Sequence, residues 1–227
     1  MKIINCQQGS KEWFAARAGL PTASAFHRLV TPLWKIRSGE GPNTYMQELL
    51  AERWMGRPLD SFTGFGALEQ GAIREEQARP FLAMQIDREI ETVGFITTDD
   101  GRAGCSPDGL VLCGSGGFRE AGAEIKCPQP AQHISNLLEG GLPADYAAQV
   151  HGSMFVTGLP VWYFLSFHPA FPPLLSRVDR DEASQKVLKS ALDGFLERLD
   201  AAWQKLIERY GQPERPAIER ERVEYAN

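Results

Sequence analysis

Three charged residues in the middle of the chain have the types and spacing of a metal site. Asp108, within an S-P-D-G segment, precedes an E-x-K tripeptide, Glu124-Ile125-Lys126, by sixteen residues. Side chains on a strand alternate between its two faces, so Glu124 and Lys126 would share one face while Ile125 enters the other. A hairpin that places Asp108 beside them would bring two carboxylates and an ammonium together. We therefore predict a site for Mg²⁺, for which Mn²⁺ could substitute, because both ions prefer carboxylate oxygens.

A site of this kind could hydrolyse a phosphodiester. A bound metal ion polarises the phosphoryl oxygen, lowers the pKa of bound water and stabilises the leaving oxygen. Asp108 and Glu124 are the expected metal ligands, with the backbone carbonyl of Ile125 as a further oxygen donor. Lys126 would orient the attacking water or deprotonate it, and the residue types leave both roles open. Because the chain has 29 acidic residues, a D…E-x-K pattern also arises by chance and does not establish a nuclease alone.

The surrounding pattern predicts an α/β (α+β mixed) fold in which helices flank a central mixed sheet. Runs of β-branched and aromatic residues, separated by turn residues, indicate strands over 90–96, 109–113, 123–127, 161–167 and 174–178. The first three strands should form an antiparallel meander. That meander is the hairpin that the site requires.

Helices are expected before, between and after these strands. N-capping residue types predict short helices after Ser10, Thr22 and Asn43, the third ending near Gly56. The apolar spacing from Leu68 to Met84 predicts an amphipathic helix. Longer helices are expected over 144–156 and from Asp181 to about Tyr210.

Composition narrows the protein class. With 227 residues, 43% of them hydrophobic, the chain can bury a core, and we expect one domain over 1–227 with a loosely held tail after about 211. The segment 146–176 lacks charged residues, but prolines and polar side chains argue against a membrane span. The sequence shows no secretory leader and its four cysteines no C-x-x-C pair, which favours reduced thiols in a cytoplasmic protein over zinc. The net charge of −5 argues mildly against nucleic acid.

Five motifs, in order, resemble the bacteriophage lambda exonuclease or YqaJ-type viral recombinase nucleases of the PD-(D/E)XK superfamily. They span most of the chain, and together they are far more specific than the D…E-x-K pattern alone. They are Gln8-Gly9…Trp13 with Arg17-x-Gly19-x-x-Thr22-Ala23-Ser24, Gly71-x-x-x-Glu75-x-x-Ala78-Arg79, Cys105-Ser-Pro-Asp-Gly109, Glu124-Ile-Lys-Cys-Pro128 and Ala148-Gln149-Val150…Ser153-Met154.

The resemblance implies a restriction-endonuclease-like core and a magnesium-dependent exonuclease with two metal ions. Such an enzyme degrades the 5′-ended strand of linear double-stranded DNA, releases mononucleotides and leaves a 3′ single-stranded overhang for recombination by strand annealing. The resemblance also implies a homotrimer around DNA, a single-strand annealing protein as partner, and a bacterial or phage-encoded origin.

Individual residues match the family's functional positions. Asp108, Glu124 and Lys126 fall on its catalytic positions, and Ile125 falls on its carbonyl ligand. Glu75 falls on a helical acid near the metals, but it could equally be an exposed partner of Arg79 one helical turn away.

A second group resembles the family's pocket for a terminal 5′-phosphate. Arginine offers a planar fork of donors to phosphate oxygens, and hydroxyl and amide groups add hydrogen bonds without charge. Each of these side chains could instead have an ordinary structural role. The four are Arg17, Ser24, Ser106 and Gln149.

Three further residues are candidates for contacts with DNA. Leu68 matches a residue that wedges between the strands, although it could be core, and Lys35 and Arg37 could contact phosphates from a loop. Both Asp99 and Asp100 are candidates for a further family acid, and the spacing to the S-P-D-G segment is one residue short.

Two other functions remain open at this stage. A PD-(D/E)XK endonuclease or junction resolvase would share Asp108, Glu124 and Lys126 but would not need a terminal phosphate pocket. A non-catalytic DNA-end binding protein would keep the fold without turnover. An iron–sulfur nuclease is disfavoured, because the cysteines do not form a close cluster.

Overall fold

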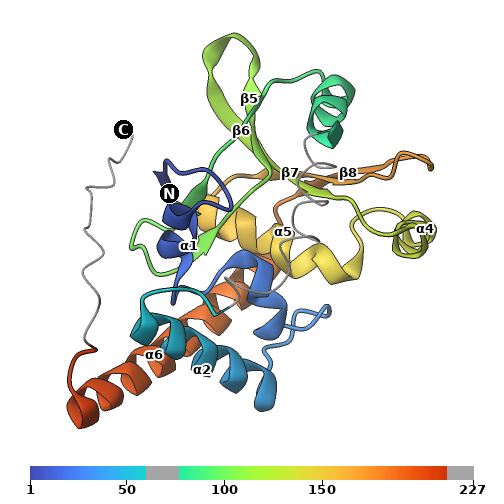
Figure 1. The fold of residues 1–227 in the computed structure, drawn as a ribbon. Helices are drawn as coiled ribbons and strands as arrows, with labels where there is room; N and C mark the ends of the chain where they lie inside the picture. The colour runs from blue at the N-terminus through green and yellow to red at the C-terminus, as the bar shows by residue number, and fades with distance from the viewer. Residues whose placement is uncertain (60–76, 214–227) are drawn as a thin grey trace.

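The computed structural model describes residues 1–59 and 77–213, and the structural statements below concern those residues. Its centre is a five-stranded sheet in the order β2-β5-β6-β7-β8 (Figure 1). Strands β6 and β7 run parallel, and the other neighbouring strands are antiparallel. The mixed sheet with helices around it confirms the predicted fold class. The strands are β2 (Ile90–Glu91), β5 (Gly109–Cys113), β6 (Phe118–Lys126), β7 (Val161–Ser166) and β8 (Leu174–Asp179).

A second sheet takes up part of one predicted strand. It has the antiparallel order β1-β3-β4 and consists of β1 (Lys2–Ile4), β3 (Phe95–Thr97) and β4 (Gly104–Cys105). The prediction of one strand over 90–96 is therefore wrong, because the chain leaves the large sheet after β2 and joins the small one at β3. Strands β2, β5 and β6 still form the expected meander in space. Strand β4 leads directly into Ser106, so the small sheet positions the S-P-D-G segment.

Two helices begin where the capping residues Ser10 and Asp181 predict. Ser10 Oγ accepts a hydrogen bond from the Trp13 N–H at 3.2 Å, and the Asp181 carboxylate accepts one from the Ser184 N–H at 2.9 Å. The helix expected from Leu68 to Met84 is present over 77–86, and the rest of that range lies outside the described residues. The other helices are α1 (Lys11–Arg17), the 3₁₀ helices η1 (Ala23–Arg28) and η2 (Gly114–Gly116), α2 (Glu40–Met55), α4 (Pro130–Glu139), α5 (Ala144–Thr157) and α6 (Glu182–Tyr210).

Three helix predictions need correction. The helix after Thr22 is the short 3₁₀ helix η1, and the Thr22 side chain makes no capping hydrogen bond. Helix α2 begins at Glu40, before Asn43, because Pro42 lies in the first turn, where its missing N–H has no partner to lose. Helix α4 is not predicted from the sequence; it begins at Pro130, a position that suits proline.

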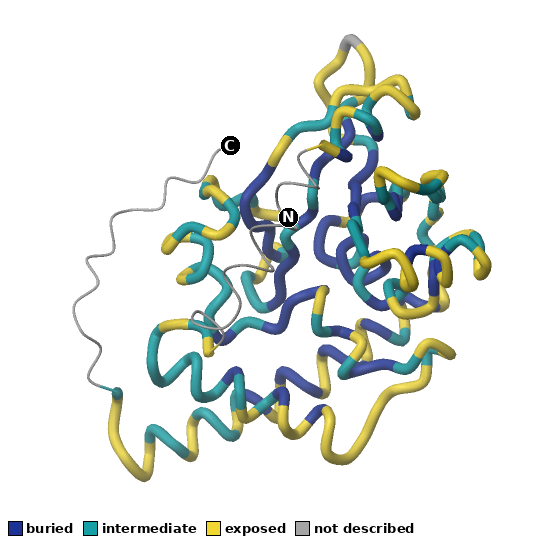
Figure 2. The backbone as a smooth tube through the Cα atoms, turned by 45° about the vertical axis from the view of Figure 1, so that its right-hand side comes forward, coloured by how far each residue is buried: buried dark blue, intermediate teal, exposed yellow. Residues whose placement is uncertain are grey.

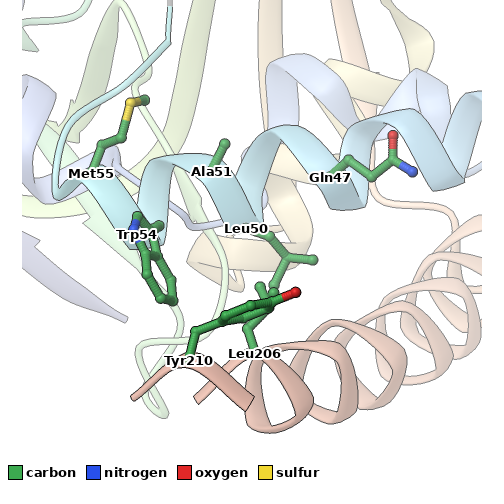
Figure 3. Close-up of a pocket in the computed structure, with 7 residues that line it drawn as sticks. All are labelled: Gln47, Leu50, Ala51, Trp54, Met55, Leu206 and Tyr210. Carbon is green, nitrogen blue, oxygen red and sulfur yellow. The ribbon is translucent and has the colours of Figure 1, made fainter. Parts of the chain in front are cut away.

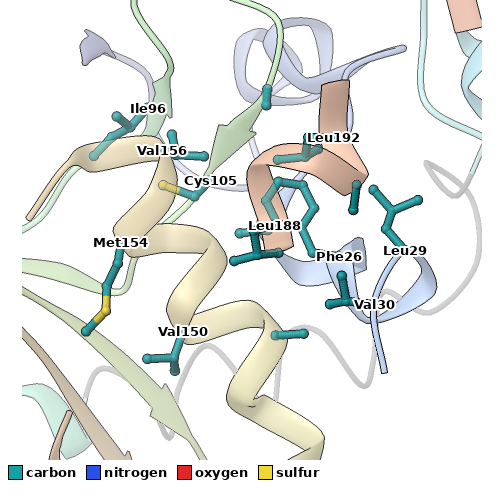
Figure 4. Packing of buried hydrophobic residues seen from close by; sticks show 14 of the residues in the cluster. Phe26, Leu29, Val30, Ile96, Cys105, Val150, Met154, Val156, Leu188 and Leu192 are labelled. Atoms are coloured by element: carbon teal, nitrogen blue, oxygen red, sulfur yellow. The ribbon is translucent and has the colours of Figure 1, made fainter. Parts of the chain in front are cut away.

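Helix α5 lies at the centre of the main core. It contacts η1, α6 and the strands β6 and β7. Val150 and Met154 of α5 are fully buried among residues such as Phe26 of η1 and Leu188 of α6 (Figure 4). Figure 2 shows that buried residues lie toward the middle of the molecule, while loops and the outer turns of helices are exposed. Burial of these apolar side chains is the main force that holds α5 in place.

The opposite face of β6 packs on the helix over 77–86. Ala123 and Ile125 of β6 are completely buried there against Ala78 and Leu82. Strand β6 is thus covered on both faces, by α5 on one and by this helix on the other.

Two glycine substitutions should have opposite effects on stability. A Cβ at Gly152 in α5 would lie 2.5 Å from Phe26 Cδ2, whereas a Cβ at the exposed Gly194 in α6 would meet nothing within 4 Å. We expect Gly152→Ala to lower the free energy of unfolding by about 1–3 kcal/mol through overpacking. Gly194→Ala should raise it by about 0.5–1 kcal/mol, because alanine is the better helix former. Urea denaturation measures both, and a stabilised Gly152→Ala would contradict the close packing of α5 on η1.

Candidate active site

The S-P-D-G segment lies beside the E-x-K strand, as the sixteen-residue spacing predicts. Gly109 pairs with Ala123 in the β5–β6 ladder, and the Asp108 N–H donates to the Ala123 carbonyl at 3.1 Å. The Ile125 N–H donates to Asp108 Oδ2 at 2.5 Å. Asp108 is therefore fixed at the start of β5, next to the end of β6.

Glu124 and Lys126 share the face of β6 that looks toward α5. The Glu124 side chain is only 2% exposed, and its Oε1 lies 2.5 Å from Lys126 Nζ. Gln149 of α5 donates through Nε2 to the same Oε1 at 2.5 Å. Ile125 points into the apolar cluster on the opposite face. The alternation expected of a strand thus brings the carboxylate, the ammonium and an amide together.

The electrostatics of Asp108 suit a cation ligand. Burial raises the pKa of the Asp108 carboxyl above its ordinary value, although the Lys126 ammonium and the Ile125 N–H oppose the rise. A positive ion close to this carboxyl would favour its ionised form. A bound cation would therefore stabilise the ionised carboxylate of Asp108 more than it would stabilise that of an exposed aspartate.

The donor set fits magnesium chemistry. Within 1–59 and 77–213, no group of three His, Cys, Asp or Glu side chains is arranged to hold a metal, so the described donors are two carboxylates and backbone oxygens. The Ile125 N–H faces Asp108, and the carbonyl of a strand residue points to the same side as its N–H. The Ile125 carbonyl thus points past the start of β5, toward Asp108. Mg²⁺ is commonly bound by one or two carboxylates with water completing its octahedron.

A compact cluster around Ser106 lies two residues before Asp108. Ser106 Oγ accepts hydrogen bonds from Arg17 NH1 at 2.8 Å and from Trp13 Nε1 at 2.9 Å. The Arg17 guanidinium stacks on the Trp13 ring, 4.3 Å from its centroid, and burial lowers its pKa without neutralising it. With both lone pairs of Ser106 Oγ used, its hydroxyl proton remains to be donated, as a phosphate oxygen would require.

The four residues of the predicted phosphate pocket are divided by the structure. Arg17 and Ser106 are in direct contact. Ser24 is exposed, and its Oγ lies 3.2 Å from Thr22 Oγ1. Gln149 contacts Glu124. Arg17 and Ser106 therefore make up one cluster, while Gln149 belongs geometrically with the carboxylates.

Two of the candidate DNA contacts, Lys35 and Arg37, lie in the loop that follows η1. Arg37 Nε donates to the carbonyls of His27 at 2.9 Å and Val30 at 3.1 Å, a structural contact at the end of η1. Lys35 is exposed in the same loop. Leu68 and Glu75 lie outside the described residues.

Neither acid in the turn between β3 and β4 lies at the end of β4 that leads to Asp108. Asp99 Oδ1 is 2.6 Å from the N-terminal nitrogen, and Asp100 accepts hydrogen bonds from the Thr98 hydroxyl at 2.5 Å and the Arg102 N–H at 3.1 Å. The turn precedes β4, whereas Asp108 follows it. Both acids have contacts that shape the turn.

Sequence reasoning missed three contacts of the site. Trp13 holds Ser106, Arg79 Nε donates to the Asp108 carbonyl at 3.0 Å, and the Tyr146 ring lies 5.8 Å from Lys126 Nζ. Tyr146 precedes Gln149 by three residues on α5, so helical spacing could have placed both on one face. No local pattern reveals the contacts of Trp13 and Arg79, because their partners are distant in sequence.

The four cysteines are all among the residues that the structure describes. All four are free thiols. Burial raises the pKa of the Cys105 thiol, and the nearby Glu124 carboxylate raises it further. These effects favour the protonated thiol of Cys105, and a protonated thiol is a poor metal ligand.

One pocket of about 500 Å³ lies away from these residues, between α2 and α6 (Figure 3). Its lining includes Leu50, Trp54, Leu206 and Tyr210. It contains no carboxylate, imidazole or thiol and offers no group for phosphoryl chemistry. Among the described residues, no helix is long and apolar enough to cross a membrane.

The sheet, its flanking helices and the position of Asp108, Glu124 and Lys126 define a fold of the PD-(D/E)XK nuclease type. The chain belongs to the YqaJ-like viral recombinase domain family, which matches residues 12–160. This membership confirms the family predicted from the five motifs and supports a nuclease role. No curated protein sequence matches the chain.

Solved structures of exonucleases share the fold. The structure of LHK-Exo in complex with dAMP is 28% identical, with a TM-score of 0.76 over 88% of this chain and 97% of that one. The alkaline exonuclease LHK-Exo from Laribacter hongkongensis gives 27% identity and the same TM-score and coverage. A phage related exonuclease from Haemophilus somnus 129PT has 12% identity and a TM-score of 0.58 over 82% of this chain and 96% of that one, a likeness of fold alone.

Proposed function

We propose that this protein is a metal-dependent exonuclease that degrades linear double-stranded DNA from 5′ to 3′. It releases mononucleotides and leaves a 3′ single-stranded overhang. The observation that carries the proposal is the adjacency of two groups. The Arg17–Ser106 cluster, suited to a terminal phosphate, lies two residues from Asp108, which contacts the strand that bears Glu124 and Lys126.

In this proposal Asp108, Glu124 and the Ile125 carbonyl hold Mg²⁺, with Mn²⁺ as a substitute and two ions in the complete site. The bound metal supplies Lewis-acid polarisation of the phosphoryl oxygen and a lowered pKa for its water. Lys126 orients the attacking water, and Gln149 fixes the Glu124 carboxylate to which Lys126 is paired. Glu75 is a further candidate acid.

The 5′ end is recognised by Arg17 and Ser106. The guanidinium donates its unused N–H groups to the terminal phosphate, and the Ser106 hydroxyl donates its proton. Ser24 adds a hydroxyl. A similar exonuclease crystallised with dAMP, which has the size and phosphate of a released mononucleotide, and this supports the proposal. Leu68, Lys35 and Arg37 remain candidate contacts to the rest of the duplex.

We expect the protein to assemble as a homotrimer. By analogy with the family, three copies of a single nuclease domain would encircle DNA and pass the overhang to a single-strand annealing protein. A ring would also reconcile the net charge of −5 with DNA binding, if cations line its channel and carboxylates face outward.

Release of acid-soluble nucleotides tests the activity. Linear 5′-phosphorylated duplex should be degraded with Mg²⁺, while closed circular duplex stays intact and EDTA abolishes the reaction, because the site needs both a free end and a metal. Cleavage of the circle would replace the proposal with an endonuclease or resolvase. Binding of ends without any cleavage would leave a non-catalytic DNA-end binding protein.

A further inference from the structure

One face of α2 holds the segment that connects Arg17 to Ser24. Tyr45, Glu48 and Glu52 follow one another at helical spacing, so their side chains point the same way. The Tyr45 hydroxyl accepts from the Thr22 N–H at 3.0 Å, and Glu48 pairs with Arg28. Glu52 contacts the segment closest to Arg17. Tyr45 and Glu52 thus hold the segment on which the proposed phosphate pocket is built, whereas the partner of Glu48, Arg28, lies outside this segment.

Gly19, two residues after the end of α1, makes the most contacts with α2 in this segment. Glu52 Oε2 accepts from the Gly19 N–H at 2.9 Å, and Arg53 Nε donates to the Gly19 carbonyl at 3.0 Å. Gly19 has φ +72°, and a Cβ there would lie 2.3 Å from Arg53 Cγ. The N–H and the carbonyl of Gly19 are therefore both hydrogen-bonded to adjacent side chains of α2. Arg53 lies so close that only glycine fits at position 19.

The two side chains are themselves held. Arg53 NH1 donates to Asp200 of α6 at 3.1 Å, and Arg102 NH2 pairs with the other oxygen of the Asp200 carboxylate. Glu52 Oε1 accepts from the Leu59 N–H at 3.1 Å. Gly19 is consequently linked through Glu52 and Arg53 to a network of contacts that includes α2 and α6.

The contacts of Gly19 also affect the position of Arg17. Arg17 is the last residue of α1, and its carbonyl accepts from the Leu20 N–H at 3.0 Å, across Gly19. A movement of Gly19 would therefore move the last helical turn and carry the guanidinium away from Ser106. Burial lowers the pKa of Arg17, and the Glu52 carboxylate is one of the nearby groups that oppose this lowering.

We propose that Glu52 and Arg53 are positioning residues that hold Gly19 and thereby set Arg17 for the 5′-terminal phosphate. They determine how strongly the protein discriminates 5′-phosphorylated from 5′-hydroxyl ends, without touching DNA. The inference rests on the proposed function, because it concerns the same pocket.

The test compares cleavage rates on linear duplex with 5′-phosphate and 5′-hydroxyl ends for Glu52→Gln, Arg17→Ala and the double variant. Glutamine keeps the side-chain shape but offers one acceptor oxygen where Glu52 uses two. We expect Glu52→Gln to narrow the phosphate preference by roughly threefold to tenfold, the effect of one lost hydrogen bond. Because Glu52 acts through Arg17, the double variant should have the same preference as Arg17→Ala alone.

Glu48→Gln is the matched control, since it removes a carboxylate from the same helix face but its partner is Arg28. It should leave the preference unchanged. If Glu52→Gln lowers the thermal midpoint sharply, Arg53→Lys is tested in its place. Lysine cannot reproduce the contacts of Arg53 with both Gly19 and Asp200, so this variant also weakens the hold on Gly19.

The results distinguish a failure of the positioning role from a failure of the proposed 5′-phosphate pocket. The positioning role is supported if Glu52→Gln, or Arg53→Lys in its place, lowers the preference for 5′-phosphorylated ends while Glu48→Gln does not. The effect must also disappear when Arg17 is already replaced by alanine. An unchanged preference in a folded variant, while Arg17→Ala narrows it, overturns the positioning role and leaves the pocket intact. If Arg17→Ala has no effect, the pocket itself is misassigned and the inference is overturned with it.

Discussion

Replacement of Asp108 by asparagine is expected to reduce cleavage of linear duplex by roughly a thousandfold or more. The amide keeps the shape of the side chain and an acceptor for the Ile125 N–H, but it removes the anionic oxygen proposed to bind the metal. Metal polarisation contributes several kcal/mol to the stabilisation of such transition states, and each 1.4 kcal/mol is about tenfold in rate. The initial rate of nucleotide release at saturating Mg²⁺ measures the loss.

Stability should not fall with activity in this variant. Burial disfavours the ionised Asp108 carboxyl and raises its pKa, so a neutral amide removes an unfavourable charge. We expect the thermal midpoint to be equal or higher. Asp100→Asn is the control, because Asp100 shapes the turn before β4, and it should cleave at the normal rate. Full activity of Asp108→Asn would contradict the assignment of the site.

Arg17→Ala should nearly abolish the distinction between 5′-phosphorylated and 5′-hydroxyl ends. Hydrogen bonds to a charged group contribute about 1.5–3 kcal/mol, so the rate on phosphorylated ends should fall by roughly tenfold to a hundredfold. The rate on 5′-hydroxyl ends should change little, because those ends lack the group that Arg17 binds. Parallel single-turnover assays on the two substrates give the ratio.

Two further variants make this result specific. Arg17→Lys keeps the charge but loses the planar fork, so it should retain only part of the preference. Arg177→Ala removes an exposed arginine of β8 and should leave the ratio as it was. An Arg17→Ala protein that slows equally on both substrates would indicate a general structural role for Arg17.

The local geometry of the catalytic group could be predicted because it depends on short-range rules. Alternation along β6 places Glu124 and Lys126 on one face and Ile125 on the other, and the sixteen-residue spacing suffices for a hairpin that returns Asp108 to them. Capping chemistry likewise identifies the starts of α1 and α6. Each of these features is encoded within one element or between neighbouring strands.

The features that could not be predicted depend on contacts between distant segments. Residues 90–96 have the composition of one strand, and only pairing with β1 and β5 divides them between two sheets. Gln149 carries an amide suited to either a phosphate or a carboxylate, and the packing of α5 on the sheet selects Glu124. The contact of Glu52 with Gly19 crosses 33 residues and has no signature in the sequence.

Helix α5 has one side in the core and another at the candidate site. Val150 and Met154 are completely buried, whereas Gln149 and Tyr146 reach Glu124 and Lys126. An opening large enough to release Gln149 would also expose those apolar side chains to water, so its free energy approaches that of global unfolding. We therefore expect the amide protons of α5 to be among the slowest in the protein to exchange with solvent.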